Sequence, residues 1–229
     1  MKKLLYKEFA LSMHPMCYVM TLVFPIMCLI PNFPLFIGTL YVVPAFSFLF
    51  LGAQKGKQSN DLFYSALLPI RKKDIVKARM ISGICMEIAC LAMLGILTPI
   101  KMVIEKAIGP TGQVFTSGGM VSCIAFAIIG YAIVNVIYFL MFYKNGRSVM
   151  APSLIATFFY LIFTMVFNSI LTAVDPVKLI PLVPGYYQAF VSIHIGYQFI
   201  YLAVALIIYF TINFFVYKKA SKELEKADL

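Results

Sequence analysis

Six long runs of apolar residues divide the sequence, and only short polar stretches separate them. An α-helix needs about 20 predominantly apolar residues to cross the hydrocarbon core of a bilayer. Lipid offers no hydrogen-bonding partners, so such runs adopt helices, whose backbone groups pair internally. The runs cover residues 16–30, 35–53, 80–100, 120–143, 149–172 and 197–217. The sequence therefore predicts an all-α membrane protein with six transmembrane helices.

The composition excludes the main soluble alternatives. Hydrophobic residues make up 62% of the chain and charged residues only 12%. A soluble domain usually carries about 25% charged residues, so neither a water-soluble globule nor a disordered tail fits. Six spans and their connections use nearly all of the 229 residues. We therefore expect one transmembrane domain over residues 1–229.

The basic residues are unevenly divided between the two sides that six spans would define. One side holds 16 of the 19 lysines and arginines, and the other holds the remaining 3. Cytoplasmic loops carry an excess of Lys and Arg, so both termini are expected in the cytoplasm. The net charge of +10 does not indicate nucleic-acid binding, because the basic residues lie in short gaps between apolar runs.

The sequence carries no motif for catalysis, metal binding or cofactor binding. The five cysteines form no C-x-x-C pair, and the only histidines are His14 and His194. We expect the cysteines to be small buried hydrophobes rather than metal ligands. The nearest match to a phosphate-binding P-loop, from Gly52 to Gln58, is one residue short between its glycines and ends in Gln instead of Ser or Thr. We expect neither an enzyme nor a resident cofactor.

Two segments are expected at the membrane surfaces. Residues 1–15 predict an amphipathic helix along the cytoplasmic interface, and a basic anchor that only sets orientation is the alternative. The apolar residues expected on one face of this helix are Leu5, Phe9, Met13 and Met16. Residues 173–196 are too apolar for an ordinary loop, yet prolines interrupt them. Re-entrant or interfacial short helices on the outer side would satisfy their backbone groups.

The longest cytoplasmic connection, residues 54–79, predicts a short helix outside the membrane. Asp61 and its neighbours can cap the start of this helix, and Pro69 ends it. The residues that share its apolar face are Phe63, Ala66 and Leu67. A basic run follows, and Asp74 is placed to cap the long helix of the third span. Such a helix suits docking to a partner protein, and a helix on the membrane surface is an equal alternative.

Glu87 is the only acidic residue deep within an apolar run. A carboxylate in hydrocarbon is costly and usually faces the bundle interior or water. Glu87 could line or gate a pathway, with Asn135, Tyr138 or Asn168 nearby. The alternative is a protonated or hydrogen-bonded acid that only packs between helices.

Two stretches resemble bacterial ABC transporter permeases of the type-2 exporter class. The first is the opening MKKLLYKEF at residues 1–9, which differs in having Glu8 where Asp is common. The second runs from Asn60-Asp61 through SALLPIRKKDIVKAR at residues 65–79. The likeness is closest to small permeases of Gram-positive bacteria, including exporters of antimicrobial or amphipathic peptides. The six-span plan extends it over the whole chain.

This resemblance implies a bacterial cell-membrane subunit that moves an apolar or amphipathic substrate, a peptide or a lipid-like molecule, out of the cell. A separate ATP-binding subunit would hold ATP and Mg²⁺, and a second permease copy or homologous permease would complete the transporter among membrane lipids. Residues 1–15 would be its connecting helix, and residues 54–79 would contain the coupling helix. The residues that would couple to the ATPase are Asp61, Leu62, Phe63, Ala66, Leu67, Pro69, Arg71, Lys72 and Asp74.

Two other classes of protein remain possible on the sequence alone. A substrate-binding membrane module of an uptake system would need a preformed polar pocket near the outer face, and few polar residues there suggest one. A membrane enzyme would need paired catalytic groups, which Glu87 alone does not supply.

Overall fold

The computed structural model describes residues 2–30, 36–40, 70–108, 119–145, 150–173 and 195–226. Helices make up almost all of these residues, and no strand occurs among them. The prediction of an all-α chain is therefore confirmed for this part. Its elements are α1 (Lys2–Lys7), η1 (Glu8–Ser12), α2 (Pro15–Met27), α3 (Phe36–Thr39), α6 (Lys72–Ile108), α7 (Gly119–Asn145), α8 (Met150–Ala173) and α10 (Ile195–Lys226).

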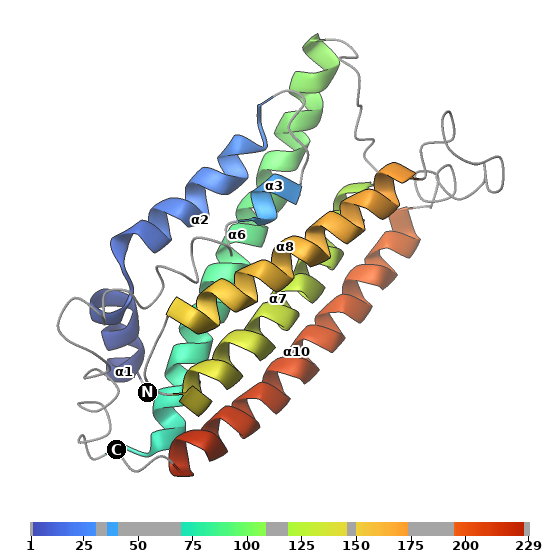
Figure 1. Cartoon of the computed structure of the whole chain (residues 1–229). Helices are drawn as coiled ribbons and strands as arrows, with labels where there is room; N and C mark the ends of the chain where they lie inside the picture. Colours follow the sequence, from blue (N-terminus) through green and yellow to red (C-terminus); the bar gives the residue numbers. More distant parts are fainter. Residues whose placement is uncertain are drawn as a thin grey trace.

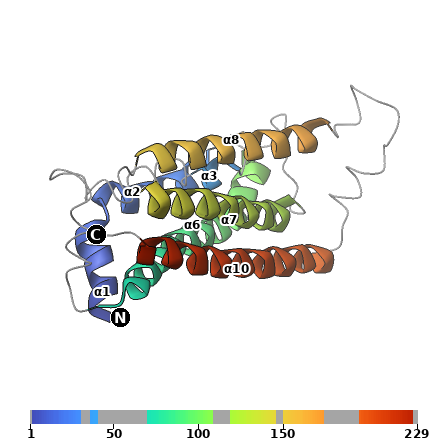
Figure 2. The ribbon, with the colours of Figure 1, turned by 60° about the horizontal axis from the view of Figure 1, so that its bottom comes forward.

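The long helices form a bundle in which α7 contacts both α8 and α10 (Figure 1). Helix α6 packs against α10 and carries α2 and α3 on another side. α6 and α8 run in one direction along the bundle, whereas α7 and α10 run in the opposite direction (Figure 1). The start of α6 and the end of α10 therefore lie together, and α1 lies across this same end (Figure 2). We call it the basic end, because Lys72, Lys73, Lys144, Lys218 and Lys219 lie there.

The N-terminal helix bends sharply before the bundle begins. The direction of residues Lys2–Ala10 differs by 76° from that of α2. Met13 and His14 both have extended backbone, and Pro15 then begins α2 with its fixed φ angle. The His14 Nδ1 atom caps α2 by accepting a hydrogen bond from the Met16 amide at 3.2 Å. The bend follows from this local sequence.

The N-terminal segment packs only part of the predicted apolar face against the bundle. Met13 is buried and Phe9 is partly buried against the core, but Met16 is 40% exposed, and Leu4, Glu8 and Ser12 are buried as well. The expected stripe assumed one continuous α-helix, but the π-turn η1 and the bend at Met13 shift the later residues onto another side.

In the part of the chain that the structure describes, three helices are long and apolar enough to cross a membrane: Lys72–Lys101, Cys123–Lys144 and Phe199–Lys226. The bent pair Lys2–Ala10 and Pro15–Met27 qualifies only when its parts are counted together, and Ala151–Val166 is a shorter apolar helix. These helices indicate a membrane-embedded protein. The six-span count stays a prediction, because residues 41–53 of the expected second span and 174–194 of the expected re-entrant segment lie outside the described residues.

Apolar side chains cover the outer faces of the bundle as well as its core. The core between α6, α7, α8 and α10 contains the buried aromatic residues Tyr131, Tyr138, Phe139 and Tyr160. On the outside, α8 exposes Phe158, Phe159 and Met165, and α10 exposes comparable residues. Exposed apolar faces of this extent suit contact with lipid rather than water.

The expectation of five buried cysteines is wrong for Cys85. Cys17, Cys28, Cys90 and Cys123 are buried, but Cys85 is exposed. It lies on the outward stripe of α6, in helical register with the exposed residues Ile88 and Ile96. An apolar run cannot distinguish this face from the buried one, because lipid and core both favour apolar side chains.

Candidate functional site

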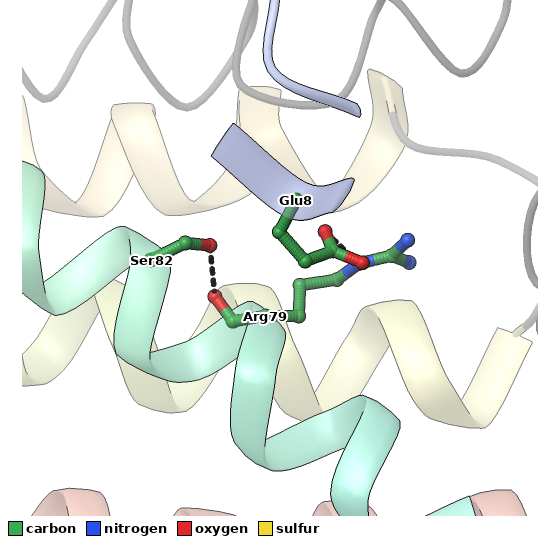
Figure 3. Close-up of polar contacts among 3 residues, drawn as sticks. All are labelled: Glu8, Arg79 and Ser82. Carbon is green, nitrogen blue, oxygen red and sulfur yellow. Dashed lines mark hydrogen bonds and ion pairs between the residues drawn. The ribbon is translucent and has the colours of Figure 1, made fainter. Parts of the chain in front are cut away.

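A buried ion pair joins the N-terminal segment to α6. The Arg79 Nε atom lies 3.2 Å from the Glu8 Oε2 atom, and the two side chains are 2% and 0% exposed (Figure 3). The Arg79 guanidinium also lies over the Phe142 ring of α7, 5.5 Å from its centroid. One arginine therefore holds the N-terminal helix, α6 and α7 together near the basic end.

A hydrogen bond within α6 involves the backbone of this arginine. The Ser82 hydroxyl donates to the Arg79 carbonyl oxygen at 2.8 Å, one turn further along the helix (Figure 3). A buried guanidinium is costly unless it is paired, and Glu8 supplies the opposite charge. The Glu8 side chain reaches from η1 to α6 to make this contact.

A second buried polar cluster lies about 12 Å further along α6, eight residues at 1.5 Å each. The Glu87 Oε2 atom accepts a hydrogen bond from the Asn135 Nδ2 group of α7 at 3.2 Å. It also accepts one from the Tyr209 hydroxyl of α10. All three side chains are at most 4% exposed. Glu87 thus links α6 to both α7 and α10 through hydrogen bonds.

Several oxygen atoms in this cluster have no hydrogen-bond partner among the described residues. They are Glu87 Oε1, Asn135 Oδ1 and Asn213 Oδ1. Asn213 belongs to the cluster because it lies one turn from Tyr209, whose carbonyl oxygen accepts from Asn213 Nδ2 at 2.9 Å. Unpaired buried oxygens are rare in folded proteins. The cluster could therefore accept a hydrogen bond from a bound proton or from a ligand.

The predicted pathway residues are only partly brought together. Asn135 does contact Glu87, as expected. Tyr138 lies one turn further along α7, stacked on Phe142 near Arg79. Asn168 lies in α8, but its side chain lies outside the described residues.

The sequence analysis missed the pairing of Glu8 with Arg79 and the part that Tyr209 plays in the cluster around Glu87. Tyr209 lies within the last apolar run, where a tyrosine resembles any other large hydrophobe. A detectable signal existed in the small and polar residues of that run. Ala205, Tyr209 and Asn213 recur at intervals of four residues and are all buried.

A third set of polar contacts surrounds the end of the short helix α3. The Tyr131 and Tyr160 hydroxyls both donate to the Thr39 carbonyl oxygen, at 3.0 and 3.1 Å. The Cys90 thiol donates to the neighbouring Gly38 carbonyl oxygen at 3.5 Å. Carbonyl groups at a helix end need outside partners, and here α6, α7 and α8 each supply one.

The basic end carries the described part of the predicted coupling segment. Arg71 is exposed, Lys72 begins α6, and the Lys73 Nζ atom lies 3.2 Å from Glu225 Oε1 of α10. The prediction that Asp74 caps α6 is wrong, because the helix begins two residues before Asp74, at Lys72. Asp74 lies in the first turn, where a carboxylate still faces the positive end of the helix dipole.

The other predicted coupling residues lie outside the described residues, which begin again at Ile70. They are Asp61, Leu62, Phe63, Ala66, Leu67 and Pro69. Among the described residues, no group of three or more His, Cys, Asp or Glu side chains could hold a metal ion.

The sequence matches no protein-family model. Comparisons with curated proteins and with solved structures also found no match.

Proposed function

We propose that the chain is the membrane-spanning permease subunit of an ATP-driven exporter of the type-2 ABC class. The observation that carries the proposal is the buried pair of Glu8 and Arg79. Glu8 lies in the opening stretch that resembles these permeases, and Arg79 ends the second such stretch. Two segments that resemble one family at separate places in the sequence are thus in direct contact.

This contact suggests how motion from an ATPase would reach the bundle. A docking helix within residues 54–69 would pull directly on the start of α6, since the chain continues from one to the other. Arg79 would carry the displacement to the N-terminal helix through Glu8. Glu87 would carry it to α7 and α10 through Asn135 and Tyr209.

The proposed assembly contains two permease copies and two ATP-binding subunits in a bacterial cell membrane, with six spans per chain and both termini in the cytoplasm. The basic end would face the cytoplasm, in accordance with the excess of Lys and Arg there. The proposed cargo is an apolar or amphipathic peptide or a lipid-like molecule, because the resemblance is closest to exporters of amphipathic peptides.

Co-purification with an ATPase subunit tests the proposal. The tagged full chain, extracted from its native membrane in mild detergent, should retain an ATP-hydrolysing subunit in stoichiometric amount. Phe63→Glu with Leu67→Glu should abolish this association, because charges would disrupt the apolar docking face. Lys226→Glu, a charge change at the basic end outside residues 54–79, is the matched control and should retain it. Equal association in both variants, or none in the unmodified chain, would contradict the proposal.

A further inference from the structure

The hydrogen bonds around Glu87 distinguish its two carboxyl oxygens. Oε2 accepts from both Asn135 Nδ2 and the Tyr209 hydroxyl, so it has the partners that a carbonyl oxygen needs. Oε1 has no partner among the described residues, and neither has Asn135 Oδ1. The carboxyl group and the amide group therefore share one hydrogen bond and each retain one unpaired oxygen.

The protonation state of Glu87 decides whether this arrangement is complete. If Glu87 were ionised, two buried acceptor oxygens would lie in the bundle without a donor among the described residues, which is strongly unfavourable. A proton on Oε1 would supply a donor, and Asn135 Oδ1, on the group that already donates to Oε2, is an acceptor without a partner among the described residues. Acid and amide would then share two hydrogen bonds, while Tyr209 still donates to Oε2.

Among the described residues, the titratable groups near Glu87 supply no positive charge to stabilise a carboxylate. The nearby titratable side chains are Cys90 of α6, Tyr160 of α8 and Tyr209 of α10, and all are neutral in their ordinary forms. Arg79 lies two turns away on α6 and is paired with Glu8. A neutral acid is the charge state that this environment favours.

We propose that Glu87 and Asn135 form a proton-binding site inside the bundle, in which Glu87 binds one proton and donates it in a hydrogen bond to Asn135. Loss of that proton leaves two facing oxygens that repel each other and weakens the contact of α6 with α7. The site belongs to the single chain and requires no ATPase, so it can be tested whether or not the proposed exporter function is correct.

Labelling with dicyclohexylcarbodiimide tests the site, because this apolar reagent adds to protonated carboxyl groups. The purified full chain in detergent should gain one carbodiimide at Glu87 at neutral pH, located by peptide mass spectrometry. Above the pH at which Glu87 ionises, the labelling rate should fall about tenfold per pH unit. Glu8 is an internal control, since it is equally buried but paired with Arg79 and should stay unlabelled. Labelling of Glu87 that is no faster than that of Glu8, or that does not change with pH, would overturn the proposal.

Glu87→Gln provides a second measurement that does not depend on labelling. A glutamine amide can donate to Asn135 Oδ1 and accept from Asn135 Nδ2, so it imitates the protonated acid. Its thermal unfolding temperature should match that of the unmodified chain at neutral pH and should not fall when the pH is raised, unlike that of the unmodified chain. A large loss of stability at neutral pH would show that a carboxylate is needed. Sodium chloride that slows labelling at fixed pH, with a choline chloride control that does not, would show a cation site instead of a proton site.

Discussion

Glu8 and Arg79, 71 residues apart in sequence, form an ion pair that solvent does not reach. The pair ties the N-terminal segment to α6, and each of its two buried charges is compensated by the other. Glu8 lies in a π-turn, an element often found at functional positions. The Tyr18 hydroxyl donates to the Phe9 carbonyl oxygen at 2.6 Å and so stabilises the same turn from α2.

Arg79→Met should destabilise the protein strongly. Methionine keeps much of the side-chain volume but leaves the Glu8 carboxylate buried without its charge partner. Removing one partner of a buried pair costs about 3–5 kcal/mol. The double variant with Glu8→Gln should recover a large part of this loss, since it removes both charges. Thermal unfolding of the detergent-solubilised variants measures both effects.

Lys73→Gln is the matched control for the buried pair. It breaks the Lys73–Glu225 pair, whose side chains are 55% and 46% exposed, and exposed pairs contribute only about 0–1 kcal/mol. An Arg79→Met variant as stable as Lys73→Gln would show that the buried pair does not hold the N-terminal helix in place.

Gly130→Ala should weaken the packing of α7 against α8. An added Cβ atom would lie 2.7 Å from Tyr160 Cε2 and 3.1 Å from Phe163 Cε1, which is too close for carbon atoms. Overpacking of this kind costs about 1–3 kcal/mol. Gly95→Ala is the control, since no described residue lies within 4 Å of its added Cβ and alanine favours the helix by about 1 kcal/mol. Thermal unfolding of the two variants should move in opposite directions, and equal shifts would contradict the packing described.

Tyr131→Phe and Tyr160→Phe test the contacts at the end of α3. Each variant removes one hydrogen bond to the Thr39 carbonyl oxygen, while the other tyrosine still donates to it. Each single change should cost about 1 kcal/mol. The double variant should cost more than the sum, because the buried carbonyl oxygen then loses both tyrosine donors. Strict additivity in thermal unfolding would show that the two hydroxyls do not share this acceptor.

Apolar periodicity predicted the positions of the long helices well, although not their full lengths. The runs at 80–100 and 197–217 fall inside α6 and α10, which extend further in both directions. The extensions are polar stretches such as those at Lys72–Arg79 and at the end of α10. Hydropathy identifies only the apolar part of a helix, the part that lipid can surround. Lysine, glutamate and alanine have high helix propensity, so the helix can continue beyond the membrane into water.

The buried polar contacts could not be predicted because they depend on which helix faces which. Arg79 reads as one more basic residue of a solvated connection until its contacts with Glu8 of η1 and Phe142 of α7 are seen. Glu87 stands out by its charge alone, and Asn135 could be suggested as a partner. Tyr209 is separated from Glu87 by 122 residues, and only the packing of α10 against α6 and α7 brings them together.

The basic end is expected to face the cytoplasm, and cysteine labelling can test this orientation directly. Single cysteines placed in a cysteine-free background at residues 58 and 228 should be blocked by a membrane-impermeant maleimide only after the cells are opened. Cysteines at residues 112 and 178 should react in intact cells, because six spans place them outside. Cys85 kept as the single cysteine is the control, since its exposed face of α6 should meet lipid and exclude the charged reagent. Reaction of the cysteine at residue 58 in intact cells would show that the orientation is the reverse of the expected one. If only one of the cysteines at residues 112 and 178 reacted in intact cells, six spans would be excluded.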